Sequence, residues 1–138
     1  MKGQYLTIEY IVFFLIGISL IISVYFIFSN IDKITEKNSV ESQLNAVGET
    51  IRGTVINVLE TSFSTSSEID YNLSIPLKLS RCIYSIQVSD NLNLNCTSNA
   101  RLGSVLSLYN LNITAKNIIY STNGYVKIHA ANGTVELG

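Results

Sequence analysis

The chain has 138 residues and a net charge of -1, with 47% hydrophobic residues. Because domains typically take about 100–150 residues, this length accommodates one modest domain with an anchor and excludes two large domains. The pI near 5.7 and the scattered Lys and Arg residues provide no basic surface of the kind that attracts nucleic acid, so no nucleic-acid partner is expected.

Residues 10–28 are almost wholly Ile, Leu, Val, Phe and Tyr, and no charged residue occurs from Tyr10 to Ile31. This is close to the roughly 20 residues that a helix needs to span a bilayer core. The apolar run is longer than that of a cleaved secretory signal, and the IDKITEKNSVESQ that follows offers no small-x-small cleavage site. We therefore expect a retained membrane-spanning helix in a membrane-inserted protein, with the N-terminus inside and the C-terminus outside.

Helical spacing continues beyond the apolar run. Apolar residues recur at steps of three or four from Val40 through Leu44 and Ile51 to Val58, with charged and polar residues between them. This pattern predicts one helix over residues 4–63, whose second half stands in water with one face covered. Gly48 and Gly53 are expected to weaken this helix and to mark bends. A Ser/Thr-rich linker is predicted over residues 64–79, closed by Pro76.

The apolar period changes to two in a predicted antiparallel β domain, residues 80–138. In CIYSIQVSDNLNLNC, alternate residues are apolar, which predicts a hairpin turning around residues 89–91. The expected register places residues whose numbers sum to 178 opposite each other, as in Tyr84 with Leu94. It also places Cys82 opposite Cys96, within disulfide range. We predict this disulfide; the alternative is two buried free thiols in a reducing compartment, since two cysteines are too few for a zinc site.

Two Asn-Gly pairs, at residues 123–124 and 132–133, each predict a two-residue hairpin. Together they predict a three-stranded meander whose apolar face carries Ile119, Val126, Ile128, Ala130, Val135 and Leu137, and whose polar face carries Tyr120, Lys127, His129 and Glu136. A further strand over residues 105–115 brings the expected number to about five. The apolar face of the sheet is expected to pack on the helix, because each needs a cover.

The chain offers little catalytic chemistry. His129 is the one histidine, and a surface pair with Glu136 across the strands explains it better than a catalytic or metal-binding role. The sequence contains no phosphate-binding loop, nucleophile elbow or metal-ligand cluster, so we expect no enzyme, no cofactor and no metal. Four Asn-x-Ser/Thr sequons, at Asn72, Asn95, Asn112 and Asn132, all follow the helix and are candidates for N-glycosylation of an extracytoplasmic domain.

At the N-terminus, Lys2-Gly3-Gln4 is followed by Thr7-Ile8-Glu9-Tyr10 and then by the apolar run. This combination, over about the first thirty residues, resembles the class III signal peptide of archaeal type IV pilin-like proteins. It implies an α+β lollipop, with a long N-terminal helix followed by a small antiparallel β domain. It also implies a leader, residues 1–3, that a prepilin peptidase recognises through Lys2 and Gly3 and removes, so that Gln4 becomes the new N-terminus.

Glu9 departs from the family pattern by one position. A cut after Gly3 makes Glu9 the sixth mature residue where the family has its acid fifth, whereas a cut after Gln4 restores the fifth place but loses the Gly before the cut. The resemblance implies that Glu9 docks subunits, because a carboxylate buried in a bundle of apolar helices needs a partner such as a neighbour's N-terminal amine. An ordinary helix-end carboxylate is the alternative reading.

Two functions follow. The first is a subunit of an archaeal type IV pilus-like surface filament, which self-associates through its apolar helix. Its partners would be other copies of the chain, a prepilin peptidase, and an assembly ATPase with its membrane platform. The alternative is a permanently membrane-anchored extracytoplasmic interaction module that does not polymerise.

Overall fold

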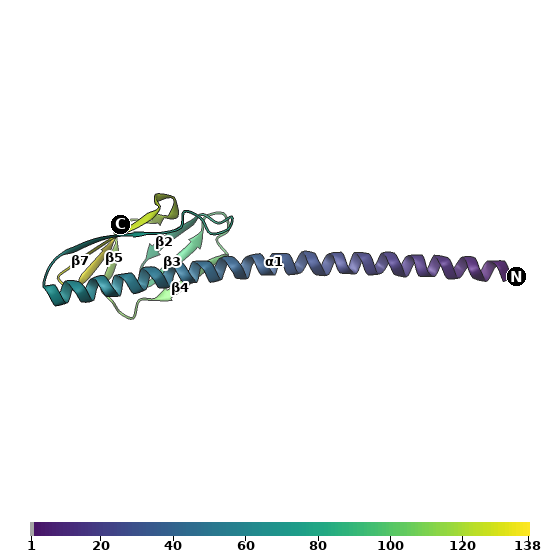
Figure 1. Ribbon diagram of the computed structural model, residues 1–138, viewed down its shortest axis with the longest axis horizontal. Coiled ribbons are helices and arrows are strands. Elements are labelled where there is room, and N and C mark those ends of the chain that lie inside the picture. The colour runs from purple at the N-terminus through teal and green to yellow at the C-terminus, as the bar shows by residue number, and fades with distance from the viewer. Residues whose placement is uncertain (1) are drawn as a thin grey trace. The chain divides into compact units, whose positions relative to one another are not determined.

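The computed structural model describes residues 2–138, with side chains from Thr7 onward. A single long helix, α1 (Lys2–Thr65), comes first, and the strands follow it along the chain (Figure 1). The predicted α+β fold class is confirmed. Helix α1 continues through Gly48 and Gly53, so neither glycine interrupts it. The chain forms two compact units, residues 1–37 and 38–138, and each is described separately.

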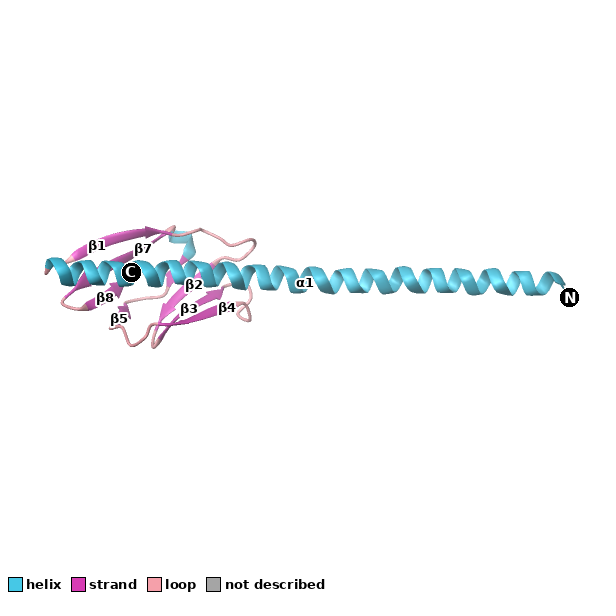
Figure 2. Cartoon of the chain, turned by 60° about the horizontal axis from the view of Figure 1, so that its bottom comes forward, coloured by secondary structure: helices cyan, strands magenta, loops and turns pink. Residues whose placement is uncertain are grey.

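The second unit contains two four-stranded sheets. One has the order β1-β7-β8-β5 and the other the order β4-β3-β2-β6. The strands are β1 (Ile69–Ser74), β2 (Tyr84–Val88), β3 (Asn91–Cys96), β4 (Gly103–Ser107), β5 (Ile113–Ala115), β6 (Ile119–Tyr120), β7 (Tyr125–Ala131) and β8 (Thr134–Leu137). All neighbours pair antiparallel except β5 and β8, which are parallel (Figure 2).

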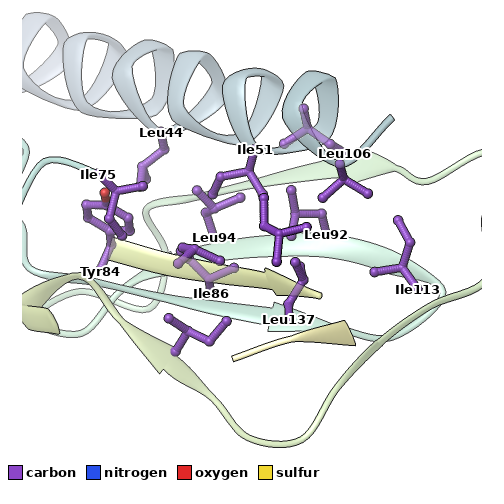
Figure 3. Packing of buried hydrophobic residues seen from close by; sticks show 14 of the residues in the cluster. Leu44, Ile51, Ile75, Tyr84, Ile86, Leu92, Leu94, Leu106, Ile113 and Leu137 are labelled. Carbon is purple, nitrogen blue, oxygen red and sulfur yellow. The ribbon is translucent and has the colours of Figure 1, made fainter. Parts of the chain in front are cut away.

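The core of this unit lies between the second half of α1 and the apolar faces of the sheets. Leu44 and Ile51 of α1 point toward Leu94 and Ile86 of the β3–β2 pair (Figure 3), and all four belong to one buried cluster. Most of the helical positions predicted to face the sheet are buried, which confirms that helix and sheet cover each other. Such burial stabilises by about 1.5–3 kcal/mol for each large apolar side chain.

Two segments differ from the sequence-based expectation. Residues 64–79, expected as a linker, contain strand β1, which pairs along its whole length with β7. Residues 105–115, expected as one strand, divide into β4 and β5 in different sheets. The division follows from Tyr109 and Asn110, whose φ angles of 50° and 58° are left-handed and cannot belong to an extended strand.

The predicted β2–β3 hairpin forms, but its register is shifted by two residues. Tyr84 lies opposite Cys96 and Ile86 opposite Leu94, so paired numbers sum to 180 rather than 178. The cause is the turn, which is centred on Asp90, with the Ser89 amide donating to the Asn91 carbonyl. A shift of two residues leaves every side chain on its predicted face, because the period of a strand is two.

The two Asn-Gly pairs behave differently. Asn132 and Gly133, with φ angles of 51° and 77°, make the predicted tight turn between β7 and β8. At the other pair, residues Ser121–Asn123 form a 3₁₀ turn that ends at Gly124, and β6 pairs with β2 instead of β7. The predicted three-stranded meander is therefore wrong. The Ser121 hydroxyl explains the difference: it donates to the Leu77 carbonyl and accepts from the Tyr84 amide, and so holds the segment against β2.

Candidate functional site

The apolar segment of α1, residues 10–28, is the main candidate for function. Its large side chains are exposed, for example Tyr10 (71% exposed), Phe14 (67%) and Phe26 (62%). The helix that contains this segment is long and apolar enough to cross a membrane by length and composition. Exposed apolar surface of this extent marks contact with a membrane or another protein, because monomeric soluble proteins rarely expose such large patches.

One serine hydroxyl within the apolar segment has a hydrogen-bond acceptor inside the helix. The Ser23 hydroxyl donates to the Ser19 carbonyl one helical turn earlier, at 2.8 Å. Satisfying the donor inside the helix lowers the cost of moving the segment into a membrane or a protein interior.

Glu9 is exposed on α1 one residue before the apolar segment. No ion pair to Glu9 occurs within the described part of the chain. Lys2, Gly3 and Gln4, the predicted recognition and cleavage residues, lie outside the residues whose side chains are described, as does the predicted leader. Among residues 7–138, no basic side chain therefore pairs with the Glu9 carboxylate.

The predicted disulfide is present. Cys82 and Cys96 are bonded with their Cα atoms 5.6 Å apart, and both are buried. Because of the shifted register, Cys82 lies just before β2, in an isolated bridge with Leu79, rather than opposite Cys96 in the ladder. The bond therefore ties the segment that leads into the hairpin to the end of β3.

The four sequons do not lie together. Asn72 is exposed on β1, Asn112 is exposed between β4 and β5, and Asn132 is exposed in the β7–β8 turn, whereas Asn95 is half-buried on β3. The Thr97 hydroxyl of the Asn95 sequon donates to the Ile83 carbonyl at 2.9 Å. Asn72, Asn112 and Asn132 are thus the more accessible acceptors.

His129 has a different partner from the one expected. It lies opposite Glu136 in the β7–β8 ladder, but its Nδ1 is 2.7 Å from the Asp70 carboxylate on β1, and Glu136 pairs with Lys116. The pattern of one hairpin could not reveal Asp70, because β1 was expected to be linker. Exposed pairs of this kind contribute about 0–1 kcal/mol. Among residues 7–138, no three His, Cys, Asp or Glu side chains form a metal-binding group.

One exposed cluster was not predicted. The Arg52 guanidinium lies 5.1 Å from the centre of the Tyr109 ring, pairs with Glu49 and donates to the Ser107 carbonyl. These contacts hold the left-handed turn at Tyr109 and Asn110 against α1. Sequence reasoning missed the cluster because its two parts are distant in the chain: Arg52 and Ser107 are separated by 55 positions.

No protein-family model, curated protein or solved structure matches the chain. The fold itself defines a class of proteins in which a long, apolar N-terminal helix is followed by a small, mostly antiparallel β domain. This class is compatible with a pilin-like subunit and with a membrane-anchored module.

Proposed function

We propose that the chain is a structural, non-enzymatic subunit of a type IV pilin-like surface filament of the archaeal kind. The precursor is inserted in the membrane through α1 with its β domain outside, a prepilin peptidase processes it, and it then polymerises through the apolar segment. An assembly ATPase and its membrane platform would drive the last step.

The observation that carries this proposal is the exposure of the apolar segment on a helix that continues into the core of the β domain. The second half of α1 supplies Leu44, Ile51 and Val55 to that core. The apolar segment, residues 10–28, is exposed instead, since Ile11, Leu15 and Ile22 are each at least 50% exposed. Such a helix suits a subunit whose apolar segment first contacts membrane lipid and then, after polymerisation, contacts the helices of neighbouring subunits.

Glu9 has a specific role in this proposal. In the membrane-inserted precursor it stands at the edge of the apolar run, where water and headgroups solvate it. In a filament it would be surrounded by apolar helices, where an unpaired charge is strongly destabilising. The amine of a neighbour's processed N-terminus would supply the opposite charge, so correct docking and charge pairing would coincide.

The test is to replace Glu9 with Ala in cells that produce the chain with its peptidase and assembly proteins. We expect the Glu9→Ala precursor to accumulate in the membrane at normal levels while sheared surface filaments disappear in electron micrographs. Glu36→Ala is the matched control, because Glu36 is exposed on the same helix beyond the apolar segment. Normal filaments from the Glu9→Ala strain would contradict the docking role.

The N-terminal residue and intact mass of the native protein separate this proposal from a permanent anchor. A start at Gln4 or Tyr5 with the apolar segment retained supports processing of the pilin type. An intact Met1 in cells with an active prepilin peptidase would favour the membrane-anchored interaction module. The disulfide supports an oxidising, extracytoplasmic location of the β domain in either case.

A further inference from the structure

Two hollows lie along α1 on the surface of the β domain, and together they are called the groove. At one end a hollow of about 380 Å³ is lined by Thr54, Asn57, Val58, Thr61, Ile69 and Tyr71. At the other end a smaller hollow of about 180 Å³ is lined by Ala46, Val47, Thr50, Ser74, Ile75 and Pro76. Thr50 and Thr54 are one helical turn apart, and the residues of α1 that line the two hollows, from Ala46 to Thr61, cover about 22 Å of the helix.

The groove is uncharged, although α1 carries charges on its other exposed sides. None of the residues that line the two hollows is acidic or basic. Elsewhere on its surface the same helix carries Glu49 and Arg52, which pair with each other, and Arg52 contacts Ser107 and Tyr109. The floor of the groove is apolar, with Val58 and Ile75 buried and Tyr71 46% exposed at its rim. One part of the surface of α1 thus carries charges, whereas the groove is lined by apolar side chains together with uncharged polar ones such as Asn57 and Ser74.

The threonines of the groove are satisfied within the helix. Thr50, Thr54 and Thr61 each donate their hydroxyl proton to the carbonyl four residues earlier, at 2.9, 2.8 and 2.7 Å. With the hydroxyl turned to the backbone, the methyl group is the remaining branch of each side chain. This flank can therefore be covered by an apolar partner without leaving these donors unpaired, which would otherwise cost about 1–3 kcal/mol each.

The chain itself carries a surface of matching chemistry. The apolar segment is free of charge, is exposed on all sides of the helix, and is about 27 Å long for its 18 steps of 1.5 Å, slightly longer than the groove. We infer that the groove receives the apolar segment of another copy of the chain. Small side chains such as Ala46 and Thr50 at the rim allow the two helices to approach closely. This inference rests on the proposed function, because polymerisation brings the apolar segments of other copies to the β domain.

Cysteine cross-linking in intact filaments tests the docking. Thr54→Cys is combined with one further cysteine at each of residues 10–28 in turn, and sheared filaments are oxidised with copper phenanthroline. The native cysteines do not interfere because they are bonded to each other. We expect dimers at positions that recur every three or four residues, because only one face of a docked helix meets the groove. Gly53→Cys is the matched control: Gly53 is exposed, with open space around it, and is rotated about 100° from Thr54.

The outcomes separate the inference from the function on which it rests. If filaments form but the Thr54→Cys series gives no dimers, or the same dimers as the Gly53→Cys series, the docking site is wrong. The proposed filament function is unaffected by that result. Dimers without helical periodicity overturn it as well, because they indicate random collision. Failure of the unsubstituted chain to form filaments overturns the proposed function, and the docking site with it.

Discussion

The hydroxyl of Tyr84 donates a hydrogen bond to the carbonyl of Pro76 at 2.8 Å, from a side chain that is fully buried. Tyr84 lies on β2 and Pro76 follows β1, so this bond connects the chain near one sheet with a strand of the other. Burial disfavours the phenolate and raises the pKa of Tyr84 from 10.0 to about 12.

This shift predicts loss of stability at high pH. The folded state holds the Tyr84 proton more tightly than the unfolded chain, so the contribution is fully present below pH 10 and is lost as the pH rises toward 12. Unfolding of the full chain by urea in detergent should show a free energy that falls by about 2–3 kcal/mol over this window. Tyr84→Phe should flatten the decline and cost about 1 kcal/mol at neutral pH, where the Pro76 carbonyl loses its donor. An equally steep decline in the variant would assign the effect to other groups.

Substitution of Gly48 and of Gly53 by Leu should change the free energy of unfolding in opposite directions. A Cβ atom at Gly48 would collide with the buried Leu106 side chain and press on Leu94, whereas one at Gly53 would meet nothing within 4 Å. We expect Gly48→Leu to lower the free energy of unfolding by about 1–3 kcal/mol through overpacking. Gly53→Leu should raise it by about 0.5–1 kcal/mol, because Leu is the better helix former. Thermal unfolding of both variants measures the difference, and equal effects would refute the close packing at Gly48.

Removal of the disulfide should destabilise the β domain without changing its fold. Cys82 and Cys96 are separated by 14 positions, and closing a loop of this size stabilises by about 3 kcal/mol. The Cys82→Ala/Cys96→Ala variant should unfold at correspondingly lower urea concentration. Comparison with the reduced, unsubstituted chain separates the lost bond from lost packing. A variant as stable as the oxidised protein would show that the bond is thermodynamically neutral.

In the β7–β8 turn, substitution of Gly133 should cost much more stability than substitution of Asn132. Gly133 has a φ of 77°, and a Cβ there would come 3.0 Å from the Phe63 ring. Gly133→Val should therefore cost about 1–3 kcal/mol through backbone strain and crowding. Asn132→Gly should change stability by only a few tenths of a kcal/mol, since glycine accepts the same left-handed conformation. Calorimetry of the two variants provides the comparison.

Much of the fold could be predicted from periodicity. The three- and four-residue spacing of Leu44, Ile51 and Val55 located the helical face of the core, and alternation located the buried residues of β2 and β3. Alternation could not fix the register, because sliding two strands by two residues exchanges no faces. It also could not distinguish the two Asn-Gly pairs, since the bonds of Ser121 to Leu77 and Tyr84 come from distant segments.

The candidate site was predictable only in part. The apolar segment is evident from composition, and Glu9 from its place before that segment. The groove between α1 and β1 was not, although Thr50, Thr54 and Thr61 have helical spacing, because β1 supplies its other wall and was not recognised as a strand. Strand β1 does alternate apolar Ile69, Tyr71 and Leu73 with polar residues. That signal was available in the sequence, but the Ser/Thr-rich residues before it favoured a linker.

The pairing of β1 with β7 also determines the order of events in biosynthesis. Ile69 of β1 pairs with Ala130 of β7, and β5 pairs with β8, which ends at Leu137. Strands β1 and β5 therefore lack their pairing partners until the chain has been made as far as Leu137. Closing so long a loop is entropically costly and slow compared with helix formation. The apolar segment is synthesised before these strands, so under the proposed function its insertion into a membrane would precede folding of the β domain. Mutations in the β domain should then leave insertion unaffected.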